Sequence, residues 1–310
     1  MKTIATVAVI GSGTMGHGIA QVAAHAGCSV RLADAVPGAA AKGLARIAKN
    51  LDGAVERGKL TGNGRRETLE RITALDDIAA AATGADILIE AAPEQLDIKQ
   101  ELFRRAEGAL AEGGILATNT SSLSIGAIAS AVRHPERVIG MHFFNPVHVM
   151  KLVEVVVHDG TAPEVRDAVL ALGAAMGKEP ILVKDSPGFA SSRLGIALGL
   201  EAMRMLESGV ASAEDIDKAM SLGYNHPMGP LRLTDLVGLD VRLAIAKYLH
   251  GALASEVFAP PAVLERLVAE GKLGKKTGHG FYDWSREPGA GPSARATGTT
   301  PDSRLPKGSA

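Results

Sequence analysis

A histidine and a glutamate in two consecutive apolar segments are the residues of this sequence best suited to acid–base chemistry. His142 follows the apolar run 138–141, and Glu154 lies inside the apolar run 152–157. Imidazole removes a hydroxyl proton readily near neutral pH, and a carboxylate is costly in an apolar strand unless it has a partner. If the two strands form a hairpin, Glu154 can accept a hydrogen bond from His142 and stabilise its charged form. Taken alone, His142 is equally compatible with a hydrogen-bonded core histidine, and Glu154 with an exposed edge-strand carboxylate.

A second polar group follows another apolar run. Asn119 and Ser121 belong to an Asn-Thr-Ser-Ser stretch directly after the run 115–118. The carboxyl ends of parallel strands share one edge of a sheet, so this stretch should open on the same side as His142. Its amide and hydroxyl groups could orient a substrate oxygen. The alternative is a plain Ser/Thr cap for a helix that begins near Ser124.

A glycine-rich loop joins the first apolar run, 4–10, to a helical pattern. Its sequence, Gly-Ser-Gly-Thr-Met-Gly, places Gly11 at the tight turn, Gly13 where a pyrophosphate approaches the backbone and Gly16 where helix and strand pack closely. We count Met15 of this loop among the cofactor-binding residues. The helix that follows offers free N–H groups and a positive dipole to the phosphates. A glycine turn that binds another ligand is the alternative.

An acidic residue ends the second predicted strand, 29–33. Asp34 stands where a carboxylate accepts hydrogen bonds from the adenosine ribose of a dinucleotide. Its charge would repel a 2′-phosphate, and the next residues, Ala35 and Val36, supply no cation to neutralise it. The sequence therefore predicts NAD as the cofactor in preference to NADP.

Composition limits the class of protein and its partners. The chain has 310 residues, 46% of them hydrophobic, so we expect a folded protein with two cores. A net charge of −1 argues against nucleic acid as a partner, and no apolar run is long enough to span a membrane. Cys28 is the only cysteine, and no targeting segment or metal-ligand spacing stands out. We therefore expect a cytoplasmic protein without a metal site.

The order of patterns predicts an α/β fold: a Rossmann-type, mostly parallel sheet domain followed by an all-α C-terminal domain. Seven β-branched runs alternate with helical stretches as far as residue 183, and four helical patterns follow after residue 190. The segment 142–151 is too short for a crossover helix, so the strands that it joins should be antiparallel. We expect an NAD-binding domain over 1–186, a helical substrate and dimerisation domain over 187–285, and a disordered tail over 286–310.

The motifs together resemble those of the L-3-hydroxyacyl-CoA dehydrogenase family, most closely its bacterial 3-hydroxybutyryl-CoA branch. The resemblance covers residues 4–284. It rests on the stretches VAVIGSGTMGHGIA, IEAAPEQLDIKQELF, ATNTSSLSI, GMHFFNPVHVMKLVEVV, DSPGF, GYNHPMGPLRLTDLVGLD and LGKKTGHGFYDW.

The resemblance implies a role for several residues. His142 would be the general base with Glu154 as its partner, and Ser121 would contact the substrate hydroxyl. The residues expected near the cofactor or nicotinamide are Glu94, Lys99 and Asn119. Asn145 would brace the active site, and the helical domain would form a homodimer. The implied reaction is the NAD-dependent, reversible oxidation of a short-chain (S)-3-hydroxyacyl-CoA.

One position departs from the family pattern. The family has PGFxxNR, whereas this chain has Ser192 in place of the asparagine that contacts substrate. A hydroxyl has a shorter reach than an amide, so substrate positioning could be looser. This leaves two alternatives open: a dehydrogenase of a hydroxy acid without CoA, such as the sugar acid gulonate, and a non-catalytic NAD-binding protein.

Basic residues gather in the helical stretch after the second strand. Cations in this stretch could hold the 3′-phosphate of CoA, and Arg57 and Lys59 are the two that we select as substrate-binding residues. The alternative is a solvated helix face, because glutamates are interleaved with the basic residues.

Overall fold

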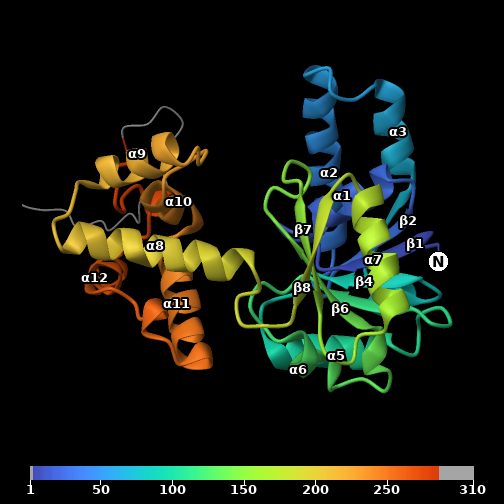
Figure 1. The fold of residues 1–310 in the computed structure, drawn as a ribbon. Helices are drawn as coiled ribbons and strands as arrows, with labels where there is room; N and C mark the ends of the chain where they lie inside the picture. Colours follow the sequence, from blue (N-terminus) through green and yellow to red (C-terminus); the bar gives the residue numbers. More distant parts are fainter. Residues whose placement is uncertain (1–2, 286–310) are drawn as a thin grey trace, which may run out of the picture. The chain divides into compact units, whose positions relative to one another are not determined.

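The structure is a computed structural model that describes residues 3–285. The chain divides into two compact units between Leu194 and Gly195. The first holds a sheet covered by helices and the second is helical, which confirms the predicted fold class (Figure 1). The predicted tail, 286–310, lies outside the described residues.

The sheet of the first unit has eight strands in the order β3-β2-β1-β4-β5-β6-β7-β8. Neighbouring strands are parallel except β6 and β7, whose antiparallel register pairs His142 with Glu154 and confirms the predicted hairpin. The order of the strands reverses at β1: β2 and β3 lie on one side of it and β4 on the other, which is where Rossmann sheets bind a dinucleotide. The strands are β1 (Thr6–Ile10), β2 (Ser29–Ala33), β3 (Ile72–Leu75), β4 (Ile87–Glu90), β5 (Ile115–Thr118), β6 (Val138–Phe143), β7 (Leu152–Val157) and β8 (Glu179–Lys184).

Helices cover both faces of this sheet. One hydrophobic core lies under α1 (Gly16–His25), α2 (Ala39–Glu56) and α7 (Pro163–Ala175). The other lies under α4 (Ile78–Ala82), α5 (Leu96–Ala106) and α6 (Ile125–Ala129). Because both faces are covered, β4 and β5 are buried along their whole length, as is usual for parallel strands. Figure 1 shows α2 and α3 (Gly62–Glu70) as a helical hairpin that projects away from the sheet.

The second unit packs its helices around a core of its own. The four predicted helical patterns correspond to α8 (Ser191–Glu207), α9 (Ala213–Gly223), α11 (Leu239–Leu253) and α12 (Ala262–Ala269). A further helix, α10 (Pro230–Val237), was not predicted, and neither was strand β3. Both are short, and β3 has only four residues at the sheet edge, too few for a period to be recognised.

A buried aspartate ties the last described residues to this helical unit. Asp235, which has no exposed surface, accepts hydrogen bonds from the backbone N–H groups of Phe281 and Tyr282, both at 2.9 Å, and from Trp284 Nε1 at 2.8 Å. A Cβ added at Gly280 would lie 2.2 Å from this carboxylate. The glycine of the HGFYDW stretch is therefore required for the chain to approach Asp235.

Within residues 3–285, no helix is long and apolar enough to cross a bilayer. In the same range, no three His, Cys, Asp or Glu side chains gather as ligands for a metal.

Candidate active site

The glycine loop is built as its sequence predicts. Gly11 has a φ of +96°, and a Cβ there would lie 2.4 Å from the carbonyl oxygen of Ala91 at the end of β4. A Cβ at Gly16 would collide with the carbonyl of Gly11. No atom lies within 4 Å of a Cβ added at Gly13, so its backbone is open to a ligand. The loop thus leaves room for a pyrophosphate at the start of α1.

Asp34 lies at the end of β2 and is tied to the glycine loop. Its Oδ2 accepts hydrogen bonds from Ser12 N at 2.7 Å and Ser12 Oγ at 2.8 Å, and Oδ1 accepts from Val36 N at 3.0 Å. Burial alone would raise the pKa of Asp34, but these hydrogen bonds lower it below its ordinary value. The carboxylate is therefore held as an anion, which suits two ribose hydroxyls and repels a 2′-phosphate.

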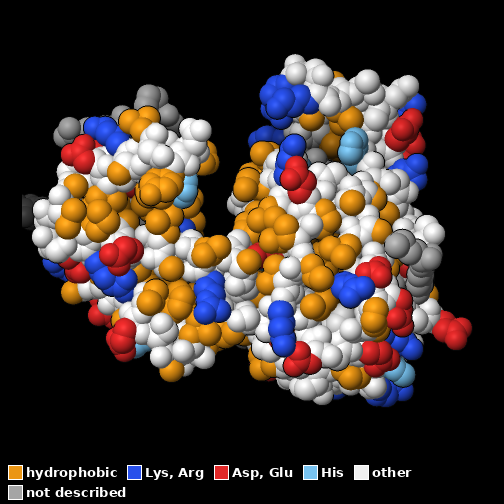
Figure 2. All heavy atoms as spheres, in the orientation of Figure 1, with side chains coloured by type: hydrophobic (Ala, Val, Ile, Leu, Met, Phe, Trp, Pro, Cys, Tyr) orange, Lys and Arg blue, Asp and Glu red, His pale blue; other side chains and the backbone are white. Residues whose placement is uncertain are grey.

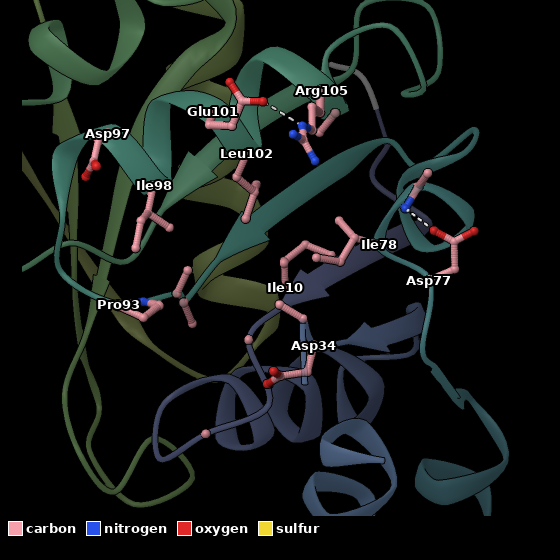
Figure 3. A pocket seen from close by; sticks show the side chains of 17 residues that line it. Ile10, Asp34, Asp77, Ile78, Pro93, Asp97, Ile98, Glu101, Leu102 and Arg105 are labelled. Atoms are coloured by element: carbon pink, nitrogen blue, oxygen red, sulfur yellow. Dashed lines mark hydrogen bonds and ion pairs between the residues drawn. The ribbon is translucent and has the colours of Figure 1, made fainter. Parts of the chain in front are cut away.

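A pocket of about 950 Å³ lies beside this loop. Figure 3 shows the side chains of Ile10, Ile78 and Leu102 converging on it from β1, α4 and α5, with Asp34 nearby. Apolar walls next to a ribose-binding carboxylate fit the adenosine half of a dinucleotide. The residues present therefore fit NAD.

The predicted contact between His142 and Glu154 is present. His142 Nδ1 lies 2.7 Å from Glu154 Oε2, and the exposed fractions of the two residues are 7% and zero. Within the described residues no hydrogen bond uses His142 Nε2. Since an ionised Glu154 accepts a hydrogen bond from Nδ1, Nε2 is the ring atom left to accept a proton from a ligand.

Glu154 has three further donors, all at the start of α8. The N–H groups of Ala190 and Ser191 lie 3.2 and 2.8 Å from Oε1, and Ser191 Oγ lies 2.9 Å from Oε2. Burial alone would raise the pKa of Glu154, but the hydrogen bonds from His142 and Ser191 lower it below its ordinary value. The carboxylate is thus charged although it is buried.

The backbone before α8 is strained where it delivers these donors. Phe189 has a φ of 50°, in the left-handed region that non-glycine residues rarely adopt, and it follows Gly188 with a φ of 75°. The ring centroid of Phe189 lies 5.8 Å from that of His142, and the ring centroid of Phe144 lies 4.6 Å from that of His142. Such strain is common at functional sites. The turn therefore leads into the residues that donate hydrogen bonds to Glu154, and it also places an aromatic ring beside His142.

The predicted polar stretch after β5 lies beside the histidine strand. Asn119 Oδ1 accepts a hydrogen bond from the backbone N–H of Phe143 at 2.9 Å. Ser121 Oγ donates to Glu94 Oε1 at 3.2 Å, and no hydrogen bond within the described residues joins Ser121 to His142. The structure thus brings Asn119 to the strand of the histidine and joins Ser121 to Glu94.

Glu94 organises this polar stretch. It accepts hydrogen bonds from Thr120 Oγ1 at 2.6 Å and from the N–H groups of Ser121 and Ser122 at 2.9 and 3.1 Å. Burial alone would raise the pKa of Glu94, but the charge of Lys99 and the hydrogen bond from Thr120 lower it. The anion therefore holds the loop that carries Asn119 and Ser121.

A second carboxylate, that of Glu90, is linked to Glu94 through Lys99. Lys99 has an exposed fraction of 1%, and its Nζ lies 2.7 Å from Glu90 Oε1 and 3.3 Å from Glu94 Oε2. Glu90, which has no exposed surface, also accepts a hydrogen bond from Thr118 Oγ1 at 2.6 Å. This network joins β4, β5 and α5 under the predicted cofactor region.

Two family models match the chain. One is described as 3-hydroxyacyl-CoA dehydrogenase, NAD binding domain, and matches residues 6–186, and the other is described as its C-terminal domain and matches residues 188–284. The chain belongs to the 3-hydroxyacyl-CoA dehydrogenase family. Its first domain binds NAD, as predicted, and the chain is an NAD-dependent oxidoreductase of this family.

Several family members are similar over most of the chain. A 3-hydroxybutyryl-CoA dehydrogenase of Clostridioides difficile is 44% identical over 280 residues, which are 90% of this chain and 99% of the relative. A 3-hydroxyadipyl-CoA dehydrogenase of Escherichia coli is 46% identical over 288 residues, and the chain spans 60% of that relative's length. The crystal structure of an (S)-3-hydroxybutyryl-CoA dehydrogenase from Ralstonia eutropha is 42% identical, with a TM-score of 0.88 over 92% of this chain and 100% of the other.

The other predicted substrate-binding residues form no hydrogen bond with His142 in the described part of the chain. Asn145 is exposed on the loop between β6 and β7, and Ser192 is partly buried, next to Ser191 in the first turn of α8. Arg57 and Lys59 are exposed at the end of α2 and just after it. Arg57 lies within electrostatic range of His148 on the β6–β7 loop: burial lowers the pKa of His148, and nearby positive charges, Arg57 included, lower it further.

Sequence reasoning missed three residues of this 3-hydroxyacyl-CoA dehydrogenase site. Glu90 could have been found as a carboxylate that ends a short, wholly apolar strand, nine positions before a lysine on the buried side of a helix. Ser191 and Phe189 gave no comparable pattern, because their roles depend on a backbone turn of positive φ.

Proposed function

We propose that the chain catalyses the reversible oxidation of (S)-3-hydroxyacyl-CoA thioesters to 3-oxoacyl-CoA with NAD. His142 Nε2 accepts the proton of the C3 hydroxyl, and the electron pair left on oxygen becomes part of the new carbonyl. Bound NAD supplies the acceptor for the hydride that leaves C3. Glu154 stabilises the imidazolium, while Asn119 and Ser121 orient the reacting oxygen. In reduction His142 returns the same proton.

One observation carries this proposal: the buried His142–Glu154 pair at 2.7 Å, with four hydrogen bonds to the carboxylate and none to His142 Nε2 within the described residues. A preformed anion next to the ring fixes its tautomer and can stabilise the positive charge that forms when the ring takes a proton from the substrate. Retention of this pair also weighs against the non-catalytic alternative. Relatives named 3-hydroxybutyryl-CoA dehydrogenase support a short acyl chain.

The direct test follows NADH oxidation with acetoacetyl-CoA, and NAD reduction with gulonate as the comparison substrate. We expect turnover with the CoA thioester and none above background with gulonate. Turnover with gulonate and none with acetoacetyl-CoA would show instead that the substrate is a sugar acid. NADH binding without turnover of either substrate would favour a non-catalytic protein, with Ser192 as the first residue to change.

For the CoA moiety, we propose that Arg57 and Lys59 bind a phosphate. Figure 2 shows Lys and Arg side chains over the α2–α3 hairpin, and the charge of Arg57 reaches the loop that follows His142. The double change Arg57→Ala with Lys59→Ala should raise KM for acetoacetyl-CoA several-fold, about what two exposed charges supply, with little change in kcat.

We propose a division of labour with NAD binding over 1–186 and with substrate binding and homodimer formation over 187–285. The helical unit supports an interface because it exposes large hydrophobic side chains, among them Val210, Leu222, Tyr224 and Val257. Figure 2 shows hydrophobic side chains gathered on the visible face of this unit. Light scattering should give twice the chain mass. A cytoplasmic location is part of the proposal, since Cys28 is the only cysteine in the sequence.

A further inference from the structure

The loop between β6 and β7 lies against the first turn of α1 and brings two histidines to the same region. A Cβ added at Gly18 would lie 2.8 Å from the Cβ of Val147. Val147 is buried in the core under α1 and α2, and its neighbour His148 is exposed on the loop. His17 is the residue before Gly18 in α1. The two histidines are therefore carried by segments of the first unit that touch each other.

A buried lysine holds this loop in place. Lys178, just after α7, has an exposed fraction of 8%, and its Nζ donates to the carbonyl oxygens of Val147 at 2.5 Å and Met150 at 2.9 Å. These two carbonyl groups flank His148 in the sequence. Burial lowers the pKa of Lys178, and within residues 3–285 no carboxylate pairs with it. The loop therefore lies over an ammonium group that no acidic side chain neutralises.

Positive groups from three segments act on His148. Burial lowers the pKa of its imidazole, and the charges of His17, Lys178 and Arg57 lower it further, with no carboxylate of the described residues among the causes. The ring forms no hydrogen bond with another described residue. His17 Nδ1 lies 2.6 Å from the carbonyl oxygen of Gly13, so its Nε2 is left for a ligand. Positive groups gathered without a carboxylate repel one another, and a bound anion removes that repulsion.

This cluster lies on the other face of the sheet from the adenosine pocket. Val147 belongs to the core under α1, α2 and α7, whereas Ile78 and Leu102 of the pocket belong to the core under α4, α5 and α6. Figure 1 shows α2 and α7 on one side of the sheet and α5 and α6 on the other. An anion beside His148 is therefore separate from the adenosine half of NAD, and it shares the charge of Arg57, a residue already proposed for the CoA moiety.

We propose that His148 and His17 form one phosphate site with Arg57, that a phosphate of the CoA substrate binds there together with a proton, and that the site favours CoA thioesters over pantetheine thioesters. The proposal rests on the function proposed above and deepens its account of substrate binding. Imidazolium and guanidinium groups both donate charge-assisted hydrogen bonds to phosphate. A histidine surrounded by positive groups gains its proton most readily when an anion is bound beside it. The site therefore contributes to KM and not to the chemical step.

The test compares acetoacetyl-CoA with acetoacetyl-pantetheine, which lacks the phosphates, on the full chain and on His148→Gln. We expect the variant to raise KM for the CoA thioester about fivefold, as for one charge-assisted hydrogen bond at an exposed site, with kcat unchanged. KM for the pantetheine thioester should not change. His134→Gln, which removes an exposed histidine of the same unit, is the matched control and should change neither value. His17→Gln should give a smaller rise, again for the CoA thioester alone.

The pH dependence of KM separates this role from a structural one. Because the phosphate binds with a proton, KM for acetoacetyl-CoA should fall as pH is lowered from about 8 to about 6.5, and less so in His148→Gln. Pantetheine thioesters should not show this difference, so they also isolate the proton transfer of His142 from it.

Three results would overturn the proposal: an equal rise of KM for both thioesters in His148→Gln, a pH dependence that this variant leaves unaltered, or a loss of NADH affinity with KM for acetoacetyl-CoA unchanged. The last would assign the phosphate to NAD. No turnover of either thioester by the unaltered protein would overturn the proposed function itself.

Discussion

Two buried ionic networks on the same sheet differ in what they leave open. Glu90, Lys99 and Glu94 form a closed group, in which Lys99 Nζ contacts both carboxylates and the carbonyl oxygen of Ala92. In the other network, Glu154 is equally well supplied with donors, but only one nitrogen of His142 is engaged. The first network holds a loop in place, and the second holds a ring whose other nitrogen is left for a ligand.

The difference teaches how to tell a catalytic pair from a structural one. Both networks contain a carboxylate without exposed surface, so burial does not separate them. What separates them is the number of unused positions on the partner: an ammonium group has three donors, and Lys99 directs them at three acceptors, whereas an imidazole has two nitrogens. Substitutions in the His142–Glu154 network should therefore lower turnover, and substitutions in the Glu90–Lys99–Glu94 network should lower stability.

The largest effect on turnover is expected for His142→Gln. Loss of the general base should lower kcat by about 10³-fold, within the usual range for acid–base catalysis. NADH affinity, measured by fluorescence titration, should change little because, within the described residues, the hydrogen bond of the ring goes to Glu154 and not to the glycine loop. A kcat within tenfold of the unaltered protein would remove His142 from the chemistry.

Glu154→Gln should lower kcat by about 10²-fold, because an amide cannot stabilise the imidazolium by charge. The substitution should also weaken the dependence of the free energy of unfolding on pH at acid pH. The pKa of Glu154 is lowered in the folded state, so its contribution to the free energy of unfolding is present above the ordinary glutamate pKa, about 4.3, and is lost as pH falls below it. Urea unfolding at several pH values checks this sign. Glu179→Gln, on the exposed edge strand β8, is the control and should leave both quantities unchanged.

A smaller loss is expected for Ser191→Ala. The variant removes one of four donors to Glu154 and keeps the backbone N–H at 2.8 Å, so kcat should fall by about tenfold, the equivalent of one hydrogen bond to a charged group. Ser130→Ala, an exposed serine at the end of α6, serves as the control. An effect as large as that of Glu154→Gln would mean that the hydroxyl itself acts on substrate.

Lys99→Met should have the smallest effect on turnover and the largest on stability. Removal of one member of a buried ion pair leaves Glu90 uncompensated and should lower the free energy of unfolding by about 3–5 kcal/mol, measured by denaturant titration. At a temperature where the variant is folded, kcat should stay within about fivefold. Lys42→Met, on the exposed face of α2, should change neither quantity. A loss of turnover without a loss of stability would contradict the comparison.

Local patterns made much of the site predictable. The glycine loop, Asp34 and the hairpin that pairs His142 with Glu154 each follow from a motif or a strand period within a few residues. The family resemblance added Glu94 and Lys99 and gave Asn119, already found from the strand pattern, a place near the cofactor. The structure places all three around one loop.

The parts that escaped prediction depend on packing between distant segments. Ser191 reaches Glu154 only because Phe189 adopts a positive φ, which its residue type does not predict. Glu90 and Lys99 meet because α5 packs on the sheet face that carries β4. Such features belong to the tertiary structure and leave no period in the sequence.

The central claim is that one group, His142, takes the proton in oxidation and returns it in reduction. Its most direct test is the pH dependence of kcat/KM in both directions with one substrate pair. The account predicts that oxidation slows as pH falls and reduction slows as pH rises, with both limbs absent in His142→Gln. Limbs that persist in this variant, or that run the same way in both directions, would contradict it.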